Sequence, residues 1–456
     1  MTPFDTSWRT EFKALSVLML PILITQFAQA GYGFVDTVMA GRVSPLDLSA
    51  VAIGSSIWFP LFFLISGIVM ATTPLVAEAQ GANKQDDIAG ITHQALWLAL
   101  LVGLLAMLFL QQVSFIFPFF DVPIHLQLQT ERYLYGVSFG MPCVAIFCVL
   151  RFYSEALGHT KIVMMISLVS VLLNIPANYV FIYGVWGLPK MGGAGCGFGT
   201  AIVMASMMLM LWAYVLLAPQ FSRTRLLQSA MKPVMPLMWR IFKLGFPIGA
   251  AIFFEVSLFS CIAILASPLG ELVVAAHQIS LSITSMIFMI PLSLAISMTI
   301  RIGNAYGRHD LAAILLTRQV GLTSTVLIAC CSAVAILLFR HYLPMLYTPH
   351  HAVQELAAAL LLFAAGYQIF DALQVGAAGC LRGIQNTRSP MIMTLIAYWV
   401  VALPVGYSLA LKPLLQHQAL GIYGFWFALI VGLGMASLLL NWRLSVNLKR
   451  LERKWR

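Results

Sequence analysis

The sequence has 456 residues, of which 61% are hydrophobic and only 9% are charged, and its mean hydropathy is +0.91. Soluble domains carry about a quarter charged residues, so this composition excludes a chain that covers itself with a water-facing surface. The formal net charge of +10 suggests a nucleic-acid partner, but the distribution of the charges gives another explanation.

Twelve apolar runs, each long enough to cross a bilayer as a helix, follow one another along the chain. In the first half they are predicted at 14–39, 48–77, 92–111, 130–157, 162–184 and 192–217. In the second half they are predicted at 240–266, 274–302, 312–338, 354–381, 391–411 and 421–441. The first run is too long for a cleaved signal and has no small-residue cleavage site. We therefore predict an all-α integral membrane protein with 12 transmembrane helices.

The basic residues are distributed unevenly between the two sides of the predicted membrane. All but five of the 26 Lys and Arg fall on the side that holds both termini. The five on the opposite side are Arg42, Arg132, Lys190, Arg340 and Lys412. Basic loops stay in the cytoplasm, so both termini are predicted to be cytoplasmic. The basic tail after Arg443 is expected to meet anionic membrane lipid, and no nucleic-acid partner is needed.

The two halves of the chain resemble each other at an offset of about 226 residues. Pro21 in LPILITQ matches Pro247 in FPIGAAI, and AQG at 79–81 matches AYG at 305–307. Later, NIPANYVFIYG matches ALPVGYSLALK, and GFGTAIV matches GFWFALI. Six spans in each half give both halves the same orientation, as in parallel-repeat transporters. We predict an N-lobe at 1–218, a cytoplasmic linker at 219–239 and a C-lobe at 240–456, which enclose a space at the midplane and support alternating access.

Three acids lie well inside predicted spans: Asp36, Glu255 and Asp371. An ionised acid at the bilayer centre costs about 2.5–3.5 kcal/mol on insertion scales, so it normally faces a cavity or a partner. No Lys or Arg lies at the centre of a predicted span. Protonation or a bound cation would neutralise these acids, so they indicate a site for a coupling ion.

Other polar residues inside the predicted spans share helix faces. Tyr367 and Asp371 share a helix face, and so do Asn174 and Asn178, because each pair is four residues apart. Oxygen ligands of this kind suit a hard cation rather than zinc. The alternatives are structural: Asp36, Glu255 or Asp371 as a packing acceptor, the two asparagines as glue between helices, and Tyr367 as a core residue.

Motifs for other chemistries are missing from the sequence. There is no Walker A sequence, no dinucleotide-binding glycine motif and no nucleophile elbow, so ATP is not an expected partner. The seven cysteines form no C-x-x-C pair, and no nucleophile–base pair or channel filter is visible. No enzyme activity and no cofactor are therefore expected.

Four of these stretches carry a family resemblance: GFVDTVMAG, NIPANYVFIYG, FFEVSLF and YQIFDALQ. In this order, on twelve spans in two repeats, they resemble the multidrug and toxic compound extrusion (MATE) family, and its bacterial NorM-type branch in particular. The resemblance covers essentially the whole chain. It implies a V-shaped pair of six-helix lobes that exports cationic and amphiphilic drugs in exchange for Na⁺ or H⁺. Each chain contains both lobes, so a monomer is expected to function.

The resemblance also implies roles for individual residues. Asp36, Asn174 and Asn178 would form the N-lobe ion site, and Glu255, Tyr367 and Asp371 would form the C-lobe cation site. Na⁺ could bind at either group. The expected aromatic drug contacts are Phe259, Tyr398 and Trp399, because aromatic faces near acids attract lipophilic cations.

One alternative keeps the fold and changes the substrate. A flippase for lipid-linked precursors, from the same superfamily, would need a basic cavity for a pyrophosphate group. The absence of Lys and Arg from the span centres disfavours it.

Overall fold

The structure is a computed structural model that describes residues 7–120, 124–187, 189–224, 232–411 and 420–455. Every regular element within these ranges is a helix, and none is a strand. The helices of the first half are α1 (Trp8–Gly41), α2 (Pro45–Val69), α3 (Thr72–Gly81), α4 (Gln85–Gln111), η1 (Val113–Phe120), α5 (Ile124–Ser138), α6 (Gly140–Ala156), α7 (Thr160–Tyr183), η2 (Val185–Gly187), η3 (Gly192–Ala194), α8 (Gly195–Leu217) and η4 (Pro219–Thr224).

The helices of the second half follow the same order. They are α9 (Met235–Ala266), η5 (Ser267–Leu269), α10 (Glu271–Gly307), α11 (Leu311–Phe339), η6 (Pro344–Leu346), α12 (His351–Gly383), α13 (Arg388–Leu395), the π-helical segment η7 (Ile396–Ala402), α14 (Leu403–Leu411) and α15 (Ile422–Trp455).

The predicted number of membrane helices is confirmed. Within the described residues, 11 helices are long and apolar enough to cross a membrane. The pair α5 and α6, bent by 42°, makes a twelfth span if it is counted as one. Prolines inside these helices, such as Pro21, Pro176 and Pro247, are tolerated because neighbouring groups satisfy the freed backbone.

The two halves share a backbone feature that supports the internal repeat. Asn83 follows the AQG sequence with φ 58°, and His309 follows the AYG sequence with φ 59°. Both residues take a left-handed conformation that is uncommon outside glycine. Their separation equals the offset that relates Pro21 to Pro247.

The described chain divides into two compact units. The first unit runs from Leu20 to Gly249, and the second combines the stretch up to Met19 with the chain from Ala250 onward. The start of α1 thus belongs to the second unit, and the start of α9 belongs to the first. The predicted division at 218 and 240 lacks this exchange of helix ends. Residues 225–231 of the predicted linker, together with Lys412 and Arg456, lie outside the described residues.

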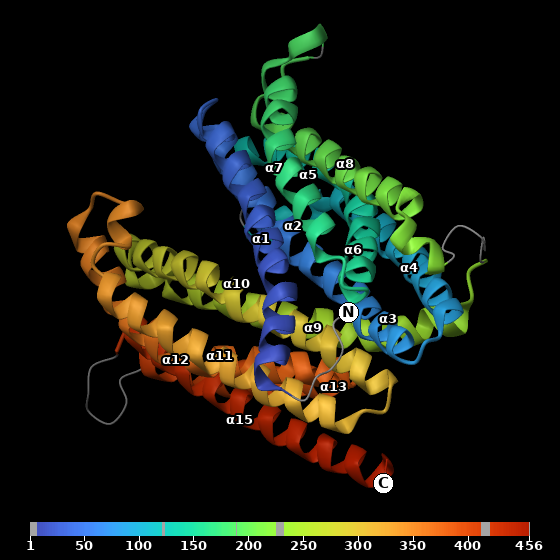
Figure 1. The fold of residues 1–456 in the computed structure, drawn as a ribbon. Coiled ribbons are helices and arrows are strands. Elements are labelled where there is room, and N and C mark those ends of the chain that lie inside the picture. Colours follow the sequence, from blue (N-terminus) through green and yellow to red (C-terminus); the bar gives the residue numbers. More distant parts are fainter. Residues whose placement is uncertain (1–6, 121–123, 188, 225–231, 412–419, 456) are drawn as a thin grey trace. The chain divides into compact units, whose positions relative to one another are not determined.

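Each unit has its own apolar core. In the first unit α8 lies beside α5, α6 and α7, and α4 lies beside α6 (Figure 1). In the second unit α12 lies beside α10, α11 and α15 (Figure 1). The close approach of α9 to α2 in the first unit depends on glycine, because a Cβ at Gly67 would lie 2.3 Å from the Gly249 Cα.

Candidate functional site

Asp36 lies at the centre of a buried polar network in the first unit. Its side chain is 2% exposed, and Oδ1 accepts hydrogen bonds from Nδ2 of Asn178 at 2.6 Å and Nδ2 of Asn174 at 3.3 Å. Oδ2 accepts a hydrogen bond from Oγ1 of Thr200 at 2.8 Å. The structure therefore brings together Asp36, Asn174 and Asn178, the three residues predicted for the first site, and adds Thr200.

Thr200 was missed in the sequence analysis. It lies in GFGTAIV, one turn into α8, where the matching stretch of the second half has Phe427. The sequence signal for Thr200 was this difference between the two halves, a hydroxyl side chain where the repeat has Phe. Gly199 beside it is needed for close approach, because a Cβ there would lie 2.1 Å from Oδ1 of Asn178.

The donors to Asp36 are all neutral. No ion pair within the described part of the chain includes Asp36. Oδ1 of Asn178 is buried and accepts no hydrogen bond from any described residue. A carboxylate held by neutral donors, with a further amide oxygen beside it, can take up a proton or a small hard cation.

A second polar cluster holds α1 within the first unit. Arg151 of α6 donates from Nη1 to Oε1 of Gln29 at 3.0 Å and from Nη2 to Oε1 of Gln26 at 2.9 Å. Its charge is paired with Glu155, since Nε lies 2.8 Å from Oε1 of that residue. Tyr32, one turn from Asp36, donates from its hydroxyl to the Ser167 carbonyl at 3.3 Å. One face of α1 thus carries a row of polar attachments that ends at Asp36.

The start of α1 is held by a different cluster, in the second unit. Glu11 is 1% exposed and pairs through both carboxylate oxygens with Arg301 of α10, which is 2% exposed. Oγ1 of Thr317, on α11, donates to Oε1 of Glu11 at 2.7 Å. Because α1 is one continuous helix, it connects this cluster to the Asp36 network.

The second predicted site also comes together. Tyr367 and Asp371 lie on α12 and are 2% and 7% exposed, and Glu255 of α9 is half-buried. The three side chains lie within electrostatic range of one another. Oδ1 of Asp371 is buried and has no hydrogen-bond partner among the described residues. This oxygen is available to a proton or a cation.

Glu255 has a basic neighbour that the search of the span centres did not include. Arg382, at the end of α12, is 7% exposed, and its positive charge attracts the Glu255 carboxylate. The residue lies one position beyond the predicted tenth span, which is why the sequence did not count it as a membrane charge. Gln374 also hydrogen bonds to the Glu255 carboxylate.

Aromatic residues surround this site. Trp426 stacks on Tyr367 with ring centres 5.9 Å apart, and its Nε1 donates to Nδ1 of His277 at 3.2 Å. Tyr398 is 1% exposed and donates from its hydroxyl to Oε1 of Gln374 at 2.6 Å. Tyr398 therefore fixes the orientation of the amide that faces Glu255.

The predicted drug contacts lie around the same core. Nε1 of Trp399 donates to the Phe254 carbonyl at 3.2 Å, and both Phe259 and Trp399 are half-buried against the apolar core of the second unit. Whether Phe259, Tyr398 or Trp399 contacts a drug stays a prediction.

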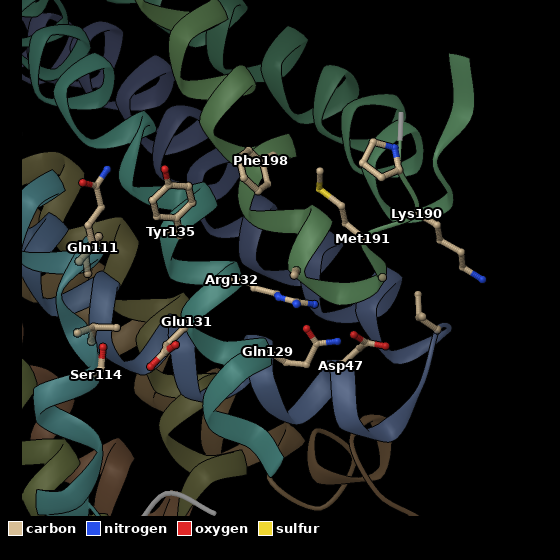
Figure 2. Close-up of a pocket in the computed structure, with 16 residues that line it drawn as sticks. Asp47, Gln111, Ser114, Gln129, Glu131, Arg132, Tyr135, Lys190, Met191 and Phe198 are labelled. Atoms are coloured by element: carbon tan, nitrogen blue, oxygen red, sulfur yellow. The ribbon is translucent and has the colours of Figure 1, made fainter. Parts of the chain in front are cut away.

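A pocket of about 750 Å³ lies at one end of the first unit. Figure 2 shows the side chains of Asp47, Gln129 and Arg132 turned toward one another in it, while Lys190 points away. Asp47 is held by the backbone N–H of Gly193, 2.8 Å from its Oδ1. The lining includes Phe198, two residues before Thr200, so the pocket reaches the part of α8 that carries the Asp36 network.

Known proteins resemble this chain in sequence over nearly its whole length. The MatE family model matches twice, at residues 21–180 and 247–408, which confirms the internal repeat. The chain is 47% identical over 447 residues to the "Probable multidrug resistance protein NorM" of Acinetobacter baylyi, with 98% of each chain covered. It is 42% identical to the "Multidrug resistance protein NorM" of Vibrio cholerae over 96% of each chain.

Solved structures show the same fold. The "eukaryotic MATE transporter AtDTX14" superposes with a TM-score of 0.90 at 20% identity and covers 99% of each chain. The two-fold match of the family model and the two high-identity relatives extend over nearly the whole sequence. The chain therefore belongs to the MATE family of membrane transporters.

Proposed function

We propose that this protein is a multidrug efflux antiporter, which exports cationic and amphiphilic compounds in exchange for Na⁺, H⁺ or both. The relatives named above are multidrug resistance proteins, which supports the substrate class. The protein works by alternating access, in which the two units move as bodies. No ATP is consumed.

The observation that carries the proposal is the environment of Asp36. A carboxylate that is 2% exposed and held only by neutral amide and hydroxyl donors has its charge balanced by no described ion pair. An acid inside the membrane is retained when it serves an ion pathway. Binding a proton or Na⁺ at Asp36 changes what its two oxygens can accept, and so changes the attachment of α1 to α7 and α8.

Helix α1 can transmit the effect of ion binding at Asp36 to the second unit. Its first turns are anchored by the Glu11–Arg301 pair, and its last turns carry Asp36. A shift of α1 at one cluster strains the other, because a helix transmits displacement along its length.

The second unit supplies a further ion site at Glu255, Tyr367 and Asp371. The orphaned Oδ1 of Asp371 and the Glu255 carboxylate attract the coupling cation or the drug cation. The aromatic residues near these acids add a cation–π attraction for lipophilic cations.

The protein is proposed to lie in the bacterial inner membrane with both termini in the cytoplasm. The asymmetry of Lys and Arg supports this orientation. The pocket of Figure 2 then faces the periplasm and gives water and ions access to the end of the first unit. Each chain holds both ion sites, so a monomer is sufficient.

The flippase alternative receives less support. A pyrophosphate group would need unpaired basic residues inside the membrane. The buried arginines of the described residues all have an acidic neighbour. Arg151 and Arg301 are each paired with a carboxylate, and Arg382 attracts the Glu255 carboxylate.

Transport by the purified protein in liposomes tests the proposal. Ethidium movement is followed while a pH gradient or a Na⁺ gradient is imposed separately, without ATP. At least one gradient should drive ethidium against its concentration, and the matching ionophore should stop it. Transport that ignores both gradients would reject antiport, and inhibition by a short-chain polyprenyl pyrophosphate would favour the flippase.

A further inference from the structure

A small groove opens between α11 and α15 in the second unit, far in sequence from both ion sites. Its volume is about 280 Å³. This is below the range of about 300–1,000 Å³ typical of sites for drug-sized ligands. It is lined by Leu311, Leu315 and Arg318 of α11 and by Ser445, Leu448, Lys449 and Glu452 of α15.

Exposed apolar residues place this groove at the edge of the membrane. On α15, Leu438 is 73% exposed and Trp442 is 60% exposed. Ser445 and Lys449 follow at helical spacing on the same face. Exposed leucines in a membrane helix face lipid, and Trp prefers the level of the headgroups. The face of α15 therefore passes from the acyl chains, through the headgroup level, into the groove.

The groove carries two basic side chains. Nη2 of Arg318 donates to Oγ of Ser445 at 3.3 Å, which orients the guanidinium toward α15. Within the described residues, no ion pair uses Arg318 or Lys449. Glu452 lies three residues after Lys449 and lowers the positive charge without cancelling it.

Basic side chains beside exposed apolar residues favour a ligand that carries an anionic group and an apolar chain. Arg and Lys bind phosphate oxygens through charge-assisted hydrogen bonds. Basic pockets between membrane helices on the cytoplasmic side are typical sites for acidic phospholipid headgroups. Leu315, which is 42% exposed, and Leu438 offer surface to the acyl chains that would extend from the groove.

We propose that this groove is a binding site for an anionic glycerophospholipid of the cytoplasmic leaflet, with the phosphodiester between Arg318 and Lys449. The placement on the cytoplasmic side rests on the proposed orientation. The lipid ties the start of α11 to the end of α15.

Lipid retention by the full-length protein tests the site without measuring transport. The protein is purified in detergent, mixed with equal amounts of dioleoyl phosphatidylglycerol and dioleoyl phosphatidylcholine, and examined by native mass spectrometry. Wild type should retain phosphatidylglycerol preferentially. Arg318→Gln and Lys449→Gln should each weaken that retention about tenfold, as the loss of a hydrogen bond to a charged group implies.

The matched controls are Arg450→Gln and Arg453→Gln, which remove the same charge from the same helix outside the groove. They should change retention less than the groove variants do. Equal losses in all four variants would mean that surface charge alone attracts the lipid, and would overturn the site. Lys449 is exposed, so its variant tests the site even if Arg318→Gln folds poorly.

Two further experiments test the charge of the groove and distinguish a lipid headgroup from free phosphate as its ligand. Glu452→Gln should strengthen phosphatidylglycerol retention, because it removes the repulsive carboxylate. Inorganic phosphate should not displace the lipid at millimolar concentration. Displacement that depends on Arg318 would identify a site for free phosphate and contradict the proposal, whatever the outcome of the transport assay.

Discussion

Glu11 and Arg301 are 290 residues apart in the sequence and form a buried ion pair that joins the start of α1 to α10. At the repeat offset of 226, their counterparts in the other half are Leu237 and Leu75, and the counterpart of Thr317 is Ile91. The second unit therefore uses an ionic cluster where the equivalent positions of the first unit are apolar.

Removing one partner of this pair should be costly. Glu11→Gln leaves the buried Arg301 charge uncompensated, which costs about 3–5 kcal/mol in comparable cases. We expect a large drop in the melting temperature of the purified protein, measured by intrinsic fluorescence. Glu355→Gln is the control, because that acid belongs to an exposed pair and should have almost no effect.

Replacing the whole cluster should be tolerated. The triple substitution Glu11→Leu, Arg301→Leu and Thr317→Ile copies the residue types at the equivalent positions of the first unit. Buried ion pairs can be exchanged for apolar residues without loss of stability. The melting temperature should return close to wild type while transport falls, if the polar anchor serves the motion of α1. Normal transport in this variant would show that the ionic character has no functional role.

Thr200 should affect ion affinity rather than drug affinity. Thr200→Val keeps the shape and removes the hydrogen bond to Oδ2 of Asp36, which should weaken coupling-ion affinity about tenfold. The measurement is the ion concentration for half-maximal drug transport. Thr37→Val is the control, because the Thr37 hydroxyl donates to the Gly33 carbonyl of its own helix and does not contact Asp36 through a hydrogen bond among the described residues. An unchanged ion dependence in Thr200→Val would remove Thr200 from the site.

Arg151 should hold α1 without taking part in ion binding. Arg151→Lys keeps the charge beside Glu155 but cannot reach both glutamines with a planar fork. Losing the two hydrogen bonds to Gln26 and Gln29 should cost about 2 kcal/mol. Maximal transport should fall in Arg151→Lys and in Gln29→Ala alike, with little change in half-maximal ion concentration. A rise in that concentration alone would assign Arg151 to the ion site instead.

Tyr398 can be tested for two roles, the drug contact expected from the sequence and the orientation of Gln374 found in the structure. As an aromatic drug contact, Tyr398→Phe would keep the ring and have little effect on either ligand. As the residue that orients Gln374, it would weaken ion binding at Glu255 when its hydroxyl is lost. Separate titrations of drug and cation binding by tryptophan fluorescence would distinguish these outcomes, and we expect a change for the cation only.

Much of the fold was predictable, because a bilayer accepts so few structures. Long apolar runs had to be helices, and Asp36 and Asp371 stood out because an acid in such a run is costly. The spacing of Asn174 and Asn178 placed them on one helix face, and the family resemblance grouped them with Asp36. The same argument failed near the helix ends, where Arg151, Arg301 and Arg382 looked like ordinary interfacial charges.

The contacts of Thr200 and of the Glu11–Arg301 pair could be found only from the structure. The Thr200 hydroxyl is inconspicuous in sequence, because Thr in a helix usually bonds to its own backbone, as Thr92 does with the Ile88 carbonyl. No local pattern connects Glu11 with Arg301, since the contact depends on the start of α1 lying in the second unit. Sequence periodicity reports faces of single helices, whereas these clusters depend on which helices meet.

The most direct test of the account is gradient-driven ethidium transport in liposomes by wild type, Asp36→Asn and Asp371→Asn, with Asp86→Asn as an exposed acid control. The pH gradient and the Na⁺ gradient are applied separately. Asp36→Asn should bind ethidium but respond to neither gradient, while Asp86→Asn should behave as wild type. Full gradient-driven transport by Asp36→Asn would contradict the central claim that this carboxylate couples ion movement to drug export.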